Sequence, residues 1–221
     1  MNPPGREGHR NVMSKLQENL QLLTETRAAT LDLIRGLSQE QLDWAPAGAW
    51  SLAEVLDHLR LSGELYRKEI IALVALAKQG RKPFIRKTVQ EIDFAPSFLP
   101  KSMLPALDVP FTVMTMFVPP VMRDLMIRYS SVLKGQTPEI ARPVKGRPGS
   151  ELIAALMQSL EDTTAMLREN AGLDWDRMSI QHPLLGINSV PQLLRLTAMH
   201  EKRHQDQMRK LVASMPSFAA A

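Results

Sequence analysis

The chain has 221 residues, of which 44% are hydrophobic and 23% are charged, and its formal net charge is +4. This composition suffices for a buried core, and the mild basic excess, with only 5% aromatic residues, does not by itself indicate nucleic-acid binding. The chain has no cysteine, which excludes disulfides, thiolate metal ligands and a cysteine nucleophile.

The N-terminal stretch, residues 1–10, is polar and contains two prolines. We expect a flexible tail there, followed by one domain over residues 11–213 and a second flexible tail over residues 214–221. The stretch lacks the apolar segment that a secretory signal needs. We therefore predict a cytoplasmic protein.

Two long helices are predicted in the first part of the chain. The first spans about residues 12–35, where apolar residues recur at helical spacing and Gly36 is a natural C-terminal stop. The second begins at Ser51, because Ser51 and Glu54 have the spacing of a capping box, and it continues to Gly80.

A long region, residues 81–149, follows the second helix and is rich in proline and methionine. It exceeds a simple bundle connection, so we interpret it as an insertion with its own structure. Its stretch 109–122 is strongly apolar, but it is too short for a membrane span and contains prolines. It could pack on the bundle, line a pocket or form a dimer contact, and packing is favoured. A shorter helix is expected around residues 120–133.

Two further helices are predicted after the insertion. The third opens at Ser150 and closes near Gly172, and the fourth opens at Ser189, where Gln192 completes another capping box. No stretch alternates apolar and polar residues for long enough to indicate a strand. The predicted fold is therefore all-α, a four-helix bundle with a long insertion between helices two and three.

Two histidines, His200 and His204, lie four residues apart on the fourth helix and share the apolar stripe with Leu193 and Met208. This spacing places both imidazoles on one face, as ligation of a divalent metal requires. The segment also matches the His-Glu-x-x-His pattern of zinc proteases, with Glu201 as general base. The protease reading fails because those enzymes take a third ligand from downstream, where this chain has no further histidine.

The third ligand must therefore come from upstream, and His58 in the second helix is the natural candidate. Taken alone, the His200–His204 pair could equally be partly exposed or bonded to neighbouring groups, and His58 alone would be more typical of a satisfied, partly buried histidine. His182 precedes the fourth helix and could approach the same end of the bundle or form a turn, whereas His9 lies in the predicted tail. Three imidazoles at one point would leave open positions on a metal, as in catalytic sites.

Two segments resemble the DinB-like (DinB/YfiT) superfamily. One runs from Leu42 through the Trp50-Ser start of the second helix to His58, and the other runs from His182 to Gln207. The resemblance implies an antiparallel-type four-helix bundle, often a homodimer, in which His58, His200 and His204 bind zinc or nickel. Members include transferases and isomerases that use bacillithiol, mycothiol or glutathione, and proteins described as metal-dependent hydrolases.

The first hypothesis is a metal-dependent enzyme, a hydrolase or a thiol S-transferase, that activates water or a low-molecular-weight thiol against a small substrate. Glu54 and Glu201 are the nearest candidates for catalytic carboxylates, although Glu54 already serves the capping box. Arg195 and Arg203 could meet an anionic group or simply be solvated. The alternative is a non-catalytic dimeric bundle that binds a metal or a ligand. We expect neither a nucleic-acid nor a membrane partner.

Overall fold

The computed structural model describes residues 6–88, 91, 115, 119, 121, 122, 125, 139–183 and 185–217, with the environments of side chains from residue 15 onward. Four long helices dominate it: α1 (Arg6–Asp32), α3 (Leu52–Lys78), α6 (Gly149–Glu169) and α7 (Val190–Ser214). Two short helices lie wholly within the described residues, α2 (Gln39–Asp43) and η2 (Glu139–Ala141). The predicted all-α class and four-helix bundle are confirmed.

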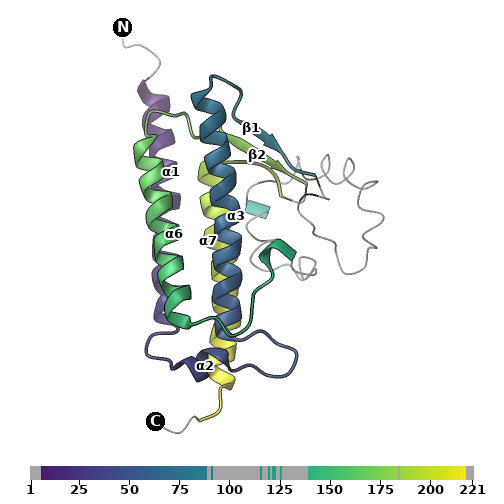
Figure 1. Ribbon diagram of the computed structural model, residues 1–221. Helices are drawn as coiled ribbons and strands as arrows, with labels where there is room; N and C mark the ends of the chain where they lie inside the picture. The colour runs from purple at the N-terminus through teal and green to yellow at the C-terminus, as the bar shows by residue number, and fades with distance from the viewer. Residues whose placement is uncertain are drawn as a thin grey trace.

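The four long helices form a bundle in which α1 and α7 run in one direction and α3 and α6 run in the other (Figure 1). Contacts link α1 to α7 and α6, and α3 to α6 and α7. Two of the four neighbouring pairs are thus parallel, whereas the family resemblance implied an antiparallel type of bundle. The parallel α3–α6 pair exists because the long insertion crosses from the end of α3 back to the start of α6.

The predicted helix boundaries rest on local hydrogen bonds and backbone conformation. The Glu54 N–H donates to Ser51 Oγ over 3.2 Å at the start of α3, and the Ser189 N–H donates to Gln192 Oε1 over 2.8 Å at the start of α7. Gly36, just beyond α1, has a φ of 79°, a left-handed conformation that favours glycine. These capping interactions confirm the predicted starts of α3 and α7.

A small three-stranded sheet lies beside the upper end of α3 and was not predicted (Figure 1). Its strands are β1 (Phe84–Arg86), β2 (Ser179–His182) and β3 (Gly186–Ser189). In strand order, β1 pairs in parallel with β2, and β2 pairs antiparallel with β3. Strands of three or four residues show too little alternation to be recognised, and the β1–β2 pairing joins segments far apart in sequence.

Two apolar clusters divide the core along the bundle axis. The upper cluster surrounds the fully buried Trp175 and includes Ile180 from the sheet. The lower cluster joins the start of α3 to the end of α7 and includes Leu56 and Met208. His58 lies two residues after Leu56, and His204 lies one turn before Met208, so the histidines lie beside the lower cluster. None of the described helices is long and apolar enough to cross a membrane.

Several predictions fall largely or wholly outside the described residues. Most of the apolar stretch 109–122 and of the expected helix at 120–133 belongs to this part of the chain, as does half of the predicted C-terminal tail. Within the described residues, Thr115 is buried and its hydroxyl donates to the Pro183 carbonyl over 2.8 Å. One point of the insertion therefore contacts the β2–β3 turn. Helix α1 already begins at Arg6, inside the stretch predicted as an N-terminal tail.

Candidate metal centre

Helices α3 and α7 bring three histidines to one point. His58 comes from the second turn of α3, whose start is set by the capping box, and His200 and His204 come from successive turns of α7. His58 Nε2 lies 3.3 Å from His200 Nε2, which lies 3.2 Å from His204 Nε2. The structure therefore brings together the three histidines predicted as ligands.

The opposite ring nitrogens of two of these histidines are held by acceptors. His58 Nδ1 lies 2.7 Å from the carbonyl oxygen of Ala141, and His204 Nδ1 lies 3.0 Å from Gln207 Oε1. Because a carbonyl oxygen can only accept, each Nδ1 must donate, and the neutral ring then keeps a lone pair on Nε2. Both lone pairs face the centre of the cluster.

The arrangement fits a divalent cation by geometry and by donor chemistry. Two nitrogens bound to zinc at 2.0–2.1 Å in tetrahedral geometry lie about 3.3–3.4 Å apart. Two of the three separations, 3.2 and 3.3 Å, agree with this value, and the three ligand atoms all lie within 4.8 Å of one another. Converging lone pairs on His58 and His204 have at most one N–H, from His200, to share between them. A cation satisfies all three, and imidazole suits zinc, nickel, copper and iron.

Burial keeps these imidazoles neutral. Burial is the largest cause of the lowered pKa of all three histidines. The pKa of His58 is lowered, that of His204 is lowered to about 3, and that of His200 lies well below its ordinary value. The nearby Arg203 guanidinium lowers all three pKa values further, while Ala141 and Asp57 partly offset the effect at His58. At neutral pH the lone pairs are therefore available without loss of a proton.

The two candidate catalytic carboxylates are both engaged elsewhere. Glu54 is buried in the capping box, where its Oε2 accepts the Ser51 N–H over 2.9 Å. Glu201, which is 1% exposed, accepts two hydrogen bonds from Arg27, over 2.9 and 3.0 Å. Neither has a hydrogen bond to a cluster histidine among the described contacts, and their proposed catalytic role stays a prediction.

The Arg27–Glu201 ion pair links α1 to α7 inside the core of the bundle. Arg27 also donates to the carbonyl oxygen of Leu156 in α6, so one guanidinium joins three helices. Glu201 is almost fully buried between these helices. Because Glu201 and His200 are adjacent on α7, its contact with Arg27 fixes the rotation of the helix that carries the imidazoles.

Sequence reasoning missed the groups that orient the imidazoles. Gln207 had a detectable signal, since it lies three residues after His204 and one helical turn further on. The Ala141 carbonyl had none, because it is a backbone atom separated from His58 by 83 residues. Trp50 packs its ring 5.1 Å from that of His58 and covers another side of the site.

The remaining histidines are not part of the cluster. His182 lies at the end of β2, where its Nδ1 accepts the Leu185 N–H over 3.3 Å and forms the turn that the sequence allowed. Burial lowers the pKa of His182 to about 4. His9 lies in the part of α1 whose side chains are outside the described environments.

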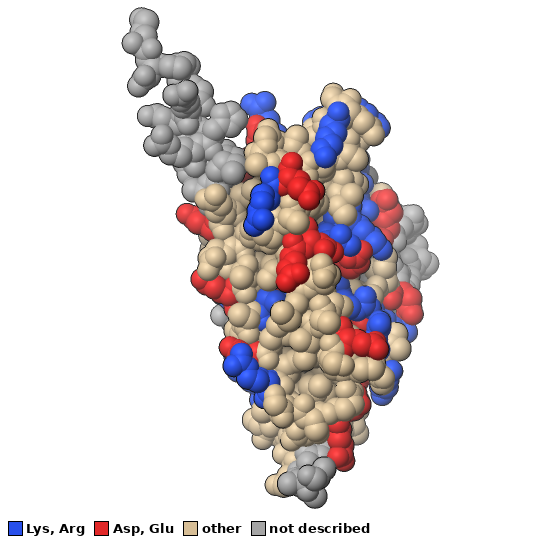
Figure 2. All heavy atoms as spheres, turned by 60° about the vertical axis from the view of Figure 1, so that its left-hand side comes forward, with Lys and Arg blue, Asp and Glu red and all other residues tan. Residues whose placement is uncertain are grey.

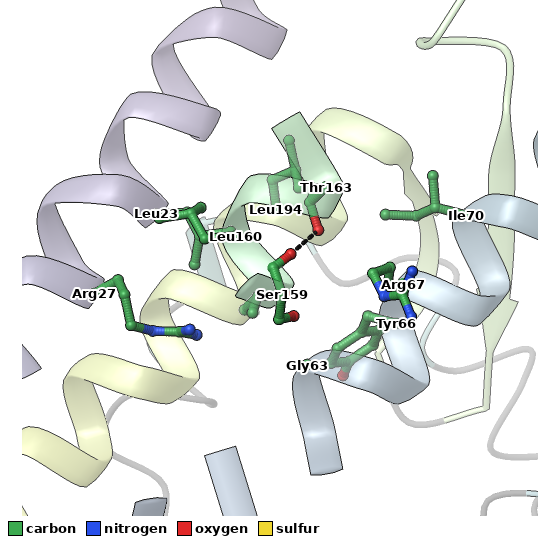
Figure 3. Close-up of a pocket in the computed structure, with 11 residues that line it drawn as sticks. Leu23, Arg27, Gly63, Tyr66, Arg67, Ile70, Ser159, Leu160, Thr163 and Leu194 are labelled. Atoms are coloured by element: carbon green, nitrogen blue, oxygen red, sulfur yellow. Dashed lines mark hydrogen bonds between the residues drawn. The ribbon is translucent and has the colours of Figure 1, made fainter. Parts of the chain in front are cut away.

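A small cavity lies among the four long helices, on the core side of α7 (Figure 3). Its volume of about 20 Å³ suffices for one water molecule and excludes a substrate. The lining includes Arg27, Gly63, Tyr66 and Ser159. Burial raises the pKa of the Tyr66 hydroxyl to about 12, so it is protonated at neutral pH.

The charged surface is mixed in sign. Lysine and arginine side chains alternate with aspartate and glutamate over the face shown in Figure 2, with no extended region of one sign there. Many of the basic groups on the described helices have acidic partners within one turn, such as Arg67 with Glu64 and Arg209 with Asp206. This face does not have the continuous basic surface that binding to a phosphate backbone needs.

A sequence model of the DinB superfamily matches residues 22–208. Among solved structures, the chain is similar to YfiT from Bacillus subtilis, described as "a probable metal-dependent hydrolase with an unusual four-helix bundle topology". The two sequences are 17% identical, the match covers 90% of this chain and 86% of that chain, and the TM-score is 0.49. No curated protein matches the chain.

Proposed function

Because the chain belongs to the DinB superfamily, we propose that it is a metal-dependent enzyme acting on a small molecule, with His58, His200 and His204 binding one divalent cation. Zinc and nickel are the proposed metals. The observation that carries the proposal is the convergence of three Nε2 atoms, of which His58 and His204 have their Nδ1 atoms bonded to acceptors.

A divalent cation held only by neutral imidazoles keeps its full positive charge and lowers the pKa of a bound water or thiol toward neutrality. Around it, the chain supplies positioning and charge. Ala141 and Gln207 hold two rings in the ligating tautomer, and Arg203 adds positive charge that would favour an anionic substrate group. The proposed reaction is hydrolysis or transfer to a thiol.

The absence of cysteine bears on the second of these reactions. A thiol nucleophile would have to arrive as a low-molecular-weight compound such as bacillithiol, mycothiol or glutathione. Assays of the metal-loaded protein with ester and amide substrates, and with an electrophile plus each thiol, would separate the two reactions. Turnover that requires a thiol supports the transferase, whereas thiol-independent turnover supports the hydrolase.

A second candidate is a non-catalytic, dimeric metal- or ligand-binding protein. Exposed apolar side chains on the described parts of the insertion favour it, since Val121 is 68% exposed and Val144 is 60% exposed. Substitution with cobalt discriminates the candidates. A visible spectrum that changes when glutathione is added supports an open coordination position, and an unresponsive spectrum in a dimer supports the alternative. The homodimer and the cytoplasmic location stay predictions that sedimentation and cell fractionation would check.

The first experiment is elemental analysis of the protein purified without a histidine tag. We expect about one equivalent of metal in the parent and a loss of most of it in His204→Ala. His182→Asn is the matched control, since it removes a half-buried histidine outside the cluster, and it should keep the metal. A parent protein that stays free of metal after incubation with zinc and nickel would overturn the proposal.

A further inference from the structure

The residue before His58 is a fully buried carboxylate with several partners. Asp57 is 0% exposed, and its Oδ1 accepts from Arg60 Nε over 2.9 Å. Its Oδ2 accepts the backbone N–H of Val144 over 2.9 Å, and Arg147 Nη1 lies 3.5 Å from Oδ1. A buried carboxylate is costly to leave without partners, so these contacts hold the groups around Asp57 in place.

The partners of Asp57 fall on the segment that returns from the insertion to α6. Val144 and Arg147 follow Ala141 at intervals of three residues, and Ala141 is the residue whose carbonyl accepts from His58 Nδ1. Two adjacent residues of α3 therefore hold three points of the same segment. The contact to Asp57 and the contact to His58 position one piece of backbone.

Apolar burial contributes little to the position of this segment. The side chains of Ile140 and Val144 are 58% and 60% exposed, and only Ala141 has a buried apolar side chain between residues 139 and 148. Gln39 in α2 adds a tether at the far end of the segment, where it donates to the Arg147 carbonyl over 3.3 Å and accepts the Gly149 N–H over 2.8 Å. Near Ala141 itself, the polar contacts to α3 are the principal restraint.

We infer that Asp57 is a positioning residue of the metal centre: it clamps the 139–147 segment so that the Ala141 carbonyl holds His58 in the tautomer that turns its Nε2 lone pair toward His200 and His204. The inference rests on the proposed function for its metal, but the clamp is a property of the metal-free chain. Asp57 would act through the backbone and the orientation of His58, without touching the substrate.

Two independent changes test the clamp from its two sides. Asp57→Ala removes the acceptor, with Asp57→Asn as the isosteric variant. Val144→Pro removes the donor N–H while leaving the carboxylate intact, and Val144→Ala is its matched control because it keeps the N–H. Glu64→Ala controls for loss of a carboxylate on α3, since Glu64 pairs with Arg67 away from the histidines.

Two measurements are made on each folded variant, as judged by circular dichroism. The first is the His58 tautomer in the metal-free protein at pH 8, from side-chain ¹H–¹⁵N correlation spectra. The second is the zinc dissociation constant, from competition with a chelator. In the parent, Val144→Ala and Glu64→Ala we expect the Nδ1–H tautomer and unchanged affinity.

In Asp57→Ala and Val144→Pro we expect His58 to shift toward the Nε2–H tautomer and zinc to bind about 10- to 100-fold more weakly, as for other groups that orient metal ligands. If Asp57→Ala does not fold, Asp57→Asn and Val144→Pro decide. Folded clamp variants that keep the parent tautomer and bind zinc within about twofold of the parent would overturn the inference. A parent with the Nδ1–H tautomer that binds no metal would overturn the proposed function and leave the clamp standing.

Discussion

The candidate metal centre and the sheet end of the bundle both contain histidines that are at least half-buried, but the Nδ1 atoms of these histidines have opposite hydrogen-bonding roles. At the metal centre, His58 Nδ1 donates to a carbonyl, so its Nε2 keeps a lone pair. At the sheet, His182 Nδ1 accepts the Leu185 N–H, so the proton of the neutral ring lies on Nε2. The partner of Nδ1 therefore decides which buried imidazole can bind a metal, and burial alone does not.

The largest expected effect tests how far the metal-centre end depends on its polar contacts. Glu201→Ala leaves Arg27 as a buried charge without its carboxylate partner, and we expect the free energy of unfolding to fall by about 3–5 kcal/mol. Denaturant titration measures it. Glu64→Ala, which breaks a partly exposed pair, should cost no more than about 1 kcal/mol.

The double variant Arg27→Met with Glu201→Leu serves as a check on the cause. It removes both charges together, so much of the lost stability should return. An equal or greater loss in the double variant would show that packing at these positions, and not an unpaired charge, accounts for the effect.

The second prediction sharpens the contrast between the two sets of histidines. Zinc at about 100 times its dissociation constant should raise the free energy of unfolding of the parent by about 2.7 kcal/mol, because only the folded chain assembles the site. Thermal unfolding with and without zinc measures the shift. His204→Ala should show no such shift, and His182→Asn should behave like the parent. Equal shifts in all three proteins would place zinc elsewhere.

The third prediction concerns the sheet end and acid. Burial lowers the pKa of His182 to about 4, below its ordinary value of 6.5, so the unfolded chain takes up this proton at the higher pH. Stability from His182 is thus complete above pH 6.5 and is lost as pH falls toward 4, by at most about 1.4 kcal/mol per pH unit.

The measurement is denaturant titration of metal-free parent and His182→Asn at pH 7, 6 and 5. Protonation of the cluster histidines also lowers stability in acid, so the change of the free energy of unfolding with pH in the parent contains the contributions of all four histidines. The variant should have a shallower slope than the parent. An identical pH dependence in parent and variant would mean that His182 is equally easy to protonate in the folded and the unfolded chain.

The smallest expected effect concerns the small cavity among the four long helices, which Gly63 helps to line. Gly63→Ala adds a methyl group in the middle of α3, where a Cβ would meet Ser159 Oγ at 3.9 Å, an ordinary contact. We expect a gain of about 0.5–1 kcal/mol in the free energy of unfolding, because alanine favours the helix. Gly149→Ala is the contrasting variant, since its Cβ would collide with Leu42 Cδ1, and it should destabilise the protein. A loss at Gly63 would indicate that the space is needed.

Sequence patterns predicted the parts of the fold that depend on near neighbours. The capping boxes at Ser51 and Ser189 and the stop at Gly36 each involve residues within one helical turn, so their signals are local. The sheet was missed because its strands are short and β1 pairs with a segment 95 residues further along the chain. The parallel helix pairs were missed for the same reason, since connection length does not specify direction.

The candidate site shows the same difference between local features, which the sequence predicts, and contacts from distant elements, which it does not. The spacing of His200 and His204 was visible, and their convergence with His58 followed from placing helical faces together. The Ala141 carbonyl and the Arg27 partner of Glu201 could not be predicted, because each reaches the site from a distant element. Asp57 gave no signal either, since the sequence does not indicate which surface of α3 the insertion covers.

The parallel α3–α6 pair sets a minimum length for the chain between them. Helix α3 has 27 residues and spans about 40 Å, so an extended return needs only about a dozen residues. Residues 81–148 far exceed that number, and they are fastened at both ends: the Lys87 N–H donates to Gln181 at the sheet, and the Val144 N–H donates to Asp57. The parallel arrangement of α3 and α6 therefore does not require a connection of this length. A shorter connection between the two anchored ends should leave the helices that carry the histidines in place.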